Sequence, residues 1–178
     1  MKIMSAKIIA IFLLLGCGRF ASGVTLTLPD ESQTITLTAL INEQADVSVP
    51  ASVIFNVTDV SQGALSAEYT ISATNVVLED GKKLRIEIIP TSEEFTPPVP
   101  GATTYQAGNV GWNSPTWVNG DGHVGALDIW GYYIVADMSS ANASELSTTQ
   151  LKFALGPNSA VNRAGNHTLS ATWKFSSL

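Results

Sequence analysis

Apolar residues alternate with polar ones along much of this chain, and this alternation constrains the fold more than any other feature. It is strict over residues 84–88, Leu-Arg-Ile-Glu-Ile, and it returns over residues 169–175 near the C-terminus. Successive side chains of a β-strand point to opposite faces, so a period of two marks a strand that buries one face. The chain is therefore expected to be all-β.

The same pattern predicts further strands over residues 24–28, 34–41, 53–58, 65–77, 127–135 and 151–155. Clusters of Gly, Pro, Asn and Asp separate most of these stretches, as is typical of turns. Seven to nine short strands with regular turns predict an antiparallel, immunoglobulin-like β-sandwich. Phe55 and Trp173 are the large residues that we expect in its core.

Three connections stand out between the predicted strands. Residues 79–82, Glu-Asp-Gly-Lys, predict a β-hairpin, because Asp-Gly tolerates the positive φ angles of a type I′ turn. Residues 91–104 are rich in proline, which cannot donate to a sheet ladder, so we expect a surface connection or an edge there. Residues 108–125 are expected to form a long loop or irregular hairpin, with a turn at residues 119–123.

The first 23 residues have the composition of an export signal. Two lysines precede an unbroken apolar run over residues 8–15, and small residues follow. Two interpretations are open: cleavage after Gly23 releases a soluble chain, or Leu14-Leu15-Gly16-Cys17, which resembles a bacterial lipobox, places a lipid on Cys17. We expect residues 24–178 to form one exported β-sandwich domain located outside the cell, on its surface or in the periplasm.

Charge and cysteine content exclude several classes of protein. Removal of residues 1–23 takes three of the nine basic residues and none of the 15 acidic ones, so the net charge changes from −6 to −9. This charge disfavours nucleic acids and anionic lipid surfaces, and we expect contact with a membrane only through a lipid anchor. The single cysteine rules out an intrachain disulfide and a cysteine-based zinc site.

No arrangement of residues predicts catalysis or metal binding. The two histidines, His123 and His167, lack the sequence context of a nucleophile and a base. Asn119 and Asp121 lie in a Gly-rich turn, but Trp130 occupies the position where an EF-hand needs an acidic residue. We therefore expect no enzyme, no catalytic residues, no metal and no cofactor.

The aromatic residues give the clearest indication of a ligand. Five of them fall between residues 112 and 133, and we select Trp112, Trp117 and Tyr133 as candidate ligand-binding residues. Exposed Trp and Tyr faces stack on sugar rings or contact protein partners, which makes a small carbohydrate-binding module one hypothesis. The alternative is that several of these side chains fill the core.

The two ends of the mature chain carry a resemblance. Residues 164–173, Ala-Gly-Asn-His-Thr-Leu-Ser-Ala-Thr-Trp, resemble the last strand of bacterial exported immunoglobulin-like and fimbrial-type subunits. The alternating start, residues 24–28 and 34–40, is similar to the N-terminal extension that such subunits lend to a neighbour. The cysteine pair of many chaperone–usher pilins is absent from this chain.

The resemblance implies a structural or adhesive protein of the cell surface, such as a fimbrial or pilus subunit that assembles by strand exchange. Val24, Leu26 and Leu28 would form the strand-exchange segment, and the partners would be identical subunits, other surface proteins or glycans. The alternative is that this segment is the first strand of its own sheet. A secreted enzyme is the weakest hypothesis.

Overall fold

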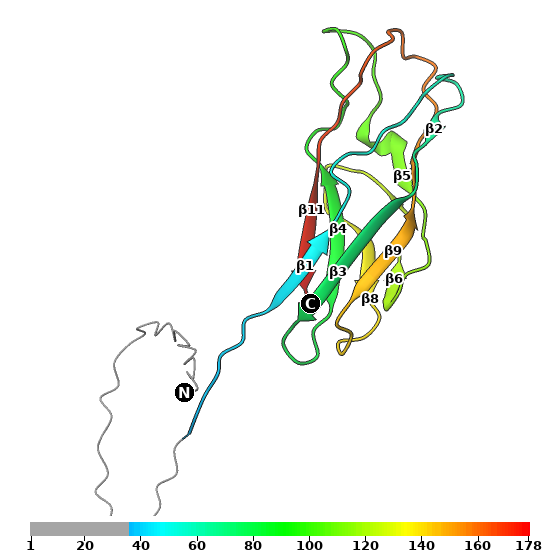
Figure 1. The fold of residues 1–178 in the computed structure, drawn as a ribbon. Helices are drawn as coiled ribbons and strands as arrows, with labels where there is room; N and C mark the ends of the chain where they lie inside the picture. Colours follow the sequence, from blue (N-terminus) through cyan, green and yellow to red (C-terminus); the bar gives the residue numbers. More distant parts are fainter. Residues whose placement is uncertain (1–35) are drawn as a thin grey trace, which may run out of the picture. The chain divides into compact units, whose positions relative to one another are not determined.

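The computed structural model describes residues 36–178, which form an all-β fold of antiparallel sheets (Figure 1). Residues Ile41–Leu178 make up one compact unit, and of the unit before it the structure describes residues 36–40. The described chain has eleven strands in three sheets and one short 3₁₀ helix. None of its helices is long and apolar enough to span a membrane.

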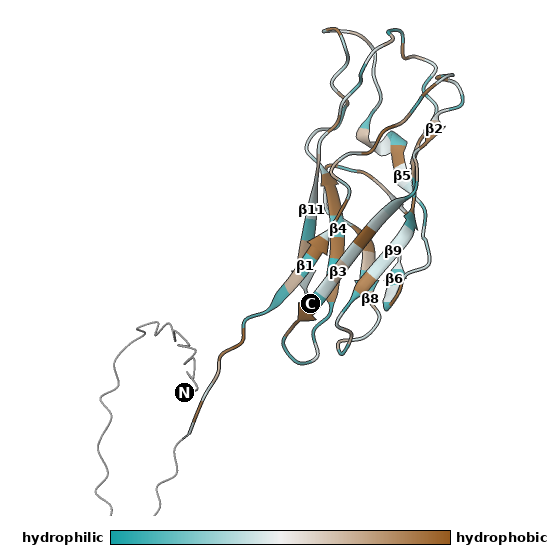
Figure 2. Cartoon of the chain, viewed as in Figure 1, coloured by the Kyte–Doolittle hydropathy of each residue, from teal (hydrophilic) through white to brown (hydrophobic). Residues whose placement is uncertain are grey.

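One layer of the fold is a four-stranded sheet centred on β4 (Leu84–Pro90). The strand order is β11 (Ala171–Ser177), β4, β8 (Tyr133–Met138) and β6 (Gly120–Gly122). β4 pairs with β11 along its whole length, from Pro90 opposite Ala171 to Leu84 opposite Ser177. The strands predicted over residues 84–88 and 169–175 are thus confirmed, and β4 is apolar along most of its length (Figure 2).

The facing layer consists of two sheets, and the chain passes from one to the other between β9 and β10. The first has the order β1 (Gln44–Ser48), β3 (Tyr69–Val77) and β9 (Leu146–Leu151), and the second has the order β2 (Ala64–Leu65), β10 (Phe153–Leu155), β5 (Val110–Trp112) and β7 (Gly125–Ala126). Lys152 alone separates β9 from β10. The Asn113 side chain bridges this break, accepting from the Lys152 N–H at 2.7 Å and donating to the Gln150 carbonyl at 3.2 Å.

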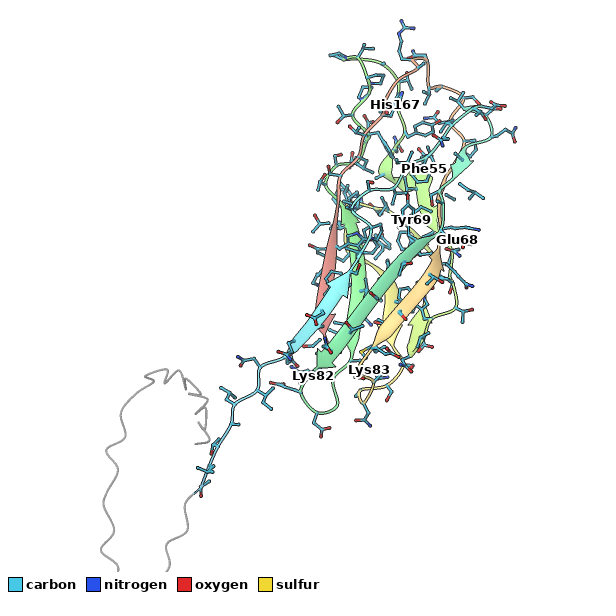
Figure 3. All side chains as sticks on the ribbon, viewed as in Figure 1. Phe55, Glu68, Tyr69, Lys82, Lys83 and His167 are labelled. Atoms are coloured by element: carbon cyan, nitrogen blue, oxygen red, sulfur yellow. The ribbon has the colours of Figure 1, made fainter. Side chains whose placement is uncertain are left out.

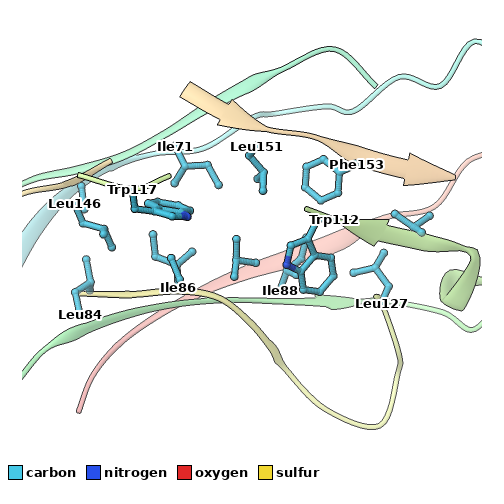
Figure 4. Packing of buried hydrophobic residues seen from close by; sticks show 14 of the residues in the cluster. Ile71, Leu84, Ile86, Ile88, Trp112, Trp117, Leu127, Leu146, Leu151 and Phe153 are labelled. Atoms are coloured by element: carbon cyan, nitrogen blue, oxygen red, sulfur yellow. The ribbon is translucent and has the colours of Figure 1, made fainter. Parts of the chain in front are cut away.

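The core lies between the two layers, as expected for a β-sandwich (Figure 4). Ile71, Leu146 and Leu151 come from one layer, and Leu84, Ile86 and Ile88 from the other; all six are buried. The tryptophans Trp112 and Trp117 fill the space between them. Phe55 and Trp173, the large residues expected in the core, are half-buried and pack against its margin.

The predicted hairpin over residues 79–82 is wrong in its partner and in its turn type. Lys82 N–H donates to the Glu79 carbonyl at 3.1 Å, so the chain does turn there. Gly81 has φ 81° but Asp80 does not have a positive φ, which fits a type II turn. β3 and β4 pair with other strands, so the turn connects the two layers.

Residues 53–58 have the predicted alternation but belong to no sheet. Val53, Phe55 and Val57 are half-buried against the core, whereas Ile54 between them is 66% exposed. Ile54 N–H donates to the Tyr69 hydroxyl at 3.3 Å. Figure 3 labels Tyr69 and Phe55, the residue after Ile54. No backbone–backbone hydrogen bond joins this stretch to another part of residues 36–178.

The segment 108–125 is more regular than the predicted loop, and its glycines explain why. It contains β5, β6 and β7, and the expected turn at residues 119–123 is mostly β6. A Cβ on Gly122 would lie 2.5 Å from Trp117 Nε1, and one on Gly125 would lie 2.3 Å from a ring carbon of Trp112. These glycines let the two indoles lie directly against the backbone of β6 and β7.

Candidate functional site

The sandwich has an open side where β1 and β11 are edge strands. β1 pairs only with β3 and β11 only with β4 among the described strands. Glu43, just before β1, joins the two edges: its carboxylate accepts from the Ser177 hydroxyl at 2.6 Å and from the Glu79 N–H at 3.0 Å. Lys82 Nζ lies 3.3 Å from the same carboxylate.

These contacts stabilise the charged form of Glu43. The hydrogen bond from the Glu79 N–H contributes most, followed by that from Ser177, and Lys82 adds a smaller effect. Together they hold the pKa of the Glu43 carboxyl below its ordinary value of 4.5. The carboxylate therefore fixes the point at which the chain enters the sandwich.

Among the described residues, three large apolar side chains shortly before this point are exposed. Leu37, Leu40 and Ile41 are 86%, 90% and 73% exposed. Residues 36–41 are outside every strand, so the strand predicted over residues 34–41 is not formed in the described part of that range. The predicted strand-exchange residues Val24, Leu26 and Leu28, and the lipidation candidate Cys17, lie outside the described residues.

Two of the three candidate ligand-binding residues are core residues. Trp112 and Trp117 are only 3% and 7% exposed, so neither ring can stack on a sugar. The expectation that these tryptophans are exposed is therefore wrong, and the alternative that they fill the core holds for both. The cause is the row of glycines in β6 and β7, which gives each indole a backbone surface to pack on.

The third candidate, Tyr133, is half-buried at the start of β8 and donates its hydroxyl to Asp128 Oδ2 at 3.2 Å. Desolvation by its neighbours and this hydrogen bond to a carboxylate raise the pKa of Tyr133 above its ordinary value. Its ring supports the loop before β8 and is not a free platform.

Trp130 is the exposed tryptophan that sequence reasoning did not select. It lies in the turn between β7 and β8, where the predicted strand over residues 127–135 is interrupted, and its side chain is 83% exposed. Tyr132 nearby is 42% exposed, with Lys174 Nζ 4.8 Å from its ring centre. Gly131, directly after Trp130, was the available signal for a turn.

A depression of about 360 Å³ opens beside Trp130. Its walls come from two segments: Leu127–Trp130 on one side and Glu93 with residues 106–108 on the other. A second depression of about 440 Å³ shares the side chain of Gln106 and is otherwise lined mainly by Thr, Asn, Pro and Glu94. Both depressions are open to solvent.

The histidines take separate structural positions. His167 bridges two loops, with Nδ1 2.7 Å from the Thr104 hydroxyl and Nε2 3.0 Å from the Arg163 carbonyl. His123 Nε2 lies 3.4 Å from Asp137, which is already paired with Arg85 at 2.6 Å. Within residues 36–178 no three His, Cys, Asp or Glu side chains are grouped as metal ligands would be.

Within residues 36–178 the geometry defines an antiparallel β-sandwich with exposed apolar residues before the first described strand and an exposed tryptophan beside a surface depression. Comparisons of the chain with protein families, with curated proteins and with solved structures found no match.

Proposed function

We propose that this protein is an exported structural or adhesive subunit of the bacterial cell surface, and that its copies assemble by strand exchange. The observation that carries the proposal is the uncovered segment before β1, in which Leu37, Leu40 and Ile41 are each more than 70% exposed. Large apolar side chains grouped on a surface indicate an interaction site. In the assembled state these side chains would be buried in a second copy of this chain.

The stretch 53–58 supplies an acceptor edge for that segment. Its backbone groups have no ladder partner among the described residues, and Val53, Phe55 and Val57 are only half-buried. An added strand would pair with this backbone and cover these side chains, as in β-strand addition. Both donor and acceptor belong to every copy, so exchange in one direction would be head-to-tail and would propagate into a fibre.

The export signal and the resemblance of the terminal residues to fimbrial-type subunits support the same location and role. The acidic composition is compatible with an exported protein that must stay soluble before assembly.

The test is a gel of the native cell-surface fraction, run unboiled beside boiled and probed for this protein. We expect a ladder that collapses to monomer on boiling. The double variant Leu37→Asp/Leu40→Asp should lose the ladder, because two carboxylates would have to be buried in the acceptor. Leu65→Asp, at a leucine that is 70% exposed elsewhere, should keep it.

Two outcomes would overturn the proposal. One is a single monomer band in both lanes for the unaltered protein. The other is a ladder that the double variant leaves unchanged.

A further inference from the structure

Trp130 is held outward by the loop that carries it. The backbone N–H of Trp130 donates to Asp128 Oδ1 at 3.2 Å, and the other oxygen of the same carboxylate accepts from the Tyr133 hydroxyl. Leu127, at the start of the loop, is 5% exposed and its N–H donates to the Val110 carbonyl at 2.8 Å. The backbone of the loop is therefore fixed at both ends, so little of it has to be ordered when a ligand binds.

The far wall of the depression is fixed as well. Ala107 N–H donates to the Glu93 carbonyl at 2.6 Å, and Gln106 N–H donates to Asn109 Oδ1 at 2.8 Å. These bonds fix the backbone at Glu93 and Gln106, which line the same depression as Trp130.

The groups around the depression fit a sugar better than an apolar side chain. The depression is lined by one exposed aromatic residue, by the polar residues Glu93, Gln106 and Asp128 and by the half-buried Ile129, whereas Leu127 and Ala107 are buried. A pyranose ring has an apolar face of C–H groups that stacks on indole and a rim of hydroxyls that bonds to carboxylates and amides. Two carboxylates disfavour an anionic ligand.

We propose that Trp130 and the depression beside it bind a neutral or amine-bearing sugar of a surface glycan. Trp130 is the stacking platform. The Glu93 carboxylate accepts hydrogen bonds from sugar hydroxyls, and the Gln106 amide both donates to them and accepts from them. Asp128 is a positioning residue that orients the loop. Gln106 also lines the second depression, so a second sugar unit would lie against Thr103 and Asn158. The site lies within one chain and does not depend on strand exchange.

The experiment uses the mature full-length chain on an array of neutral, amine-bearing and sialylated oligosaccharides, followed by calorimetric titration with the best mono- and disaccharide. We expect retention on neutral or amine-bearing glycans and a weaker response to sialylated ones. Trp130→Ala should lower the affinity about ten-fold or more, and Trp130→Phe should lower it less. Val124→Ala, at an exposed apolar residue outside the depression, is the matched control.

Asp128→Asn separates positioning from direct contact. The asparagine keeps an acceptor for the backbone N–H of Trp130, so this variant should preserve most of the affinity for the glycan. Asp128→Ala removes the acceptor and should lose most of that affinity. The proposal is overturned if no glycan is bound, if sialylated glycans are preferred, if Trp130→Ala binds as well as the unaltered chain, or if Trp130 is covered by a protein partner and not by a glycan.

Discussion

Glu43 shows how one exposed carboxyl can hold two edge strands together. Because its pKa is lower in the folded chain than its ordinary value of 4.5, its stabilising effect is present above that pH. The effect should be lost as the pH falls below 4.5 through the folded pKa. Urea unfolding between pH 2.5 and 6 should therefore show a smaller pH dependence in Glu43→Gln than in the unaltered chain.

Glu145→Gln is the control for that measurement. Glu145 is exposed and forms no ion pair within residues 36–178. Its removal should leave the slope below pH 4.5 unchanged, and an equal flattening in both variants would contradict the role of Glu43.

Truncation of Trp112 should destabilise the fold strongly, whereas truncation of Trp130 should hardly change its stability. Trp112 is in the core, so Trp112→Ala should lower the free energy of unfolding by about 3–5 kcal/mol. Trp130 is exposed, so Trp130→Ala should change it by less than about 0.5 kcal/mol. Trp112→Phe should cost less than Trp112→Ala, because the buried Trp112 Nε1 has no partner in the described chain and its loss sacrifices no hydrogen bond. Chemical denaturation of the three variants checks all three values.

At the scale of elements, β6 and β7 depend on glycines that accept the tryptophan rings. Gly122→Ala and Gly125→Ala would each place a methyl group inside 3 Å of an indole, so each should destabilise the fold by about 1–3 kcal/mol. Gly131→Ala is the matched control, because a Cβ there meets nothing within 4 Å. Thermal unfolding should rank Gly131→Ala above the other two variants, and equal stability of all three would contradict the packing role.

The sequence predicted the elements whose pattern is local and missed those that depend on partners. Residues 84–88 and 169–175 alternate strictly, and both became the strands of one paired ladder. The alternation over residues 53–58 correctly predicted which side chains face inward, but it could not show that no strand within residues 36–178 pairs with this stretch. The Asp80-Gly81 turn was likewise visible, whereas the choice of sheet on either side of it was set by long-range pairing.

The candidate site followed the same division. The sequence showed a cluster of aromatic residues, but the exposure of each side chain depends on where the strand ends. The alternation of inward and outward side chains does not continue across a turn. The exposure within the cluster is the reverse of the expected one: Trp112 and Trp117, which pack on Gly125 and Gly122, are buried, whereas Trp130 in the turn is exposed.

At the scale of the whole molecule, strand exchange would give each subunit one donor and one acceptor. A Leu37→Asp/Leu40→Asp variant should still accept a segment from a normal copy but should not donate its own. Mixtures of the two should therefore form shorter ladders as the share of the variant rises, because each variant ends a growing fibre. Native gels of co-expressed mixtures check this, and ladders of constant length would point to a symmetric, closed contact instead.

The uneven burial of the four tryptophans has a practical consequence. Trp112 and Trp117 are sealed in the core, Trp173 is half-buried, and Trp130 alone stands almost fully in water. Iodide in solution should quench the fluorescence of Trp130 first, and the remaining emission should come from rings shielded by the sandwich. The chain thus carries its own optical probe, in which the quenchable fraction reports what covers the loop and the shielded fraction reports whether the fold is intact.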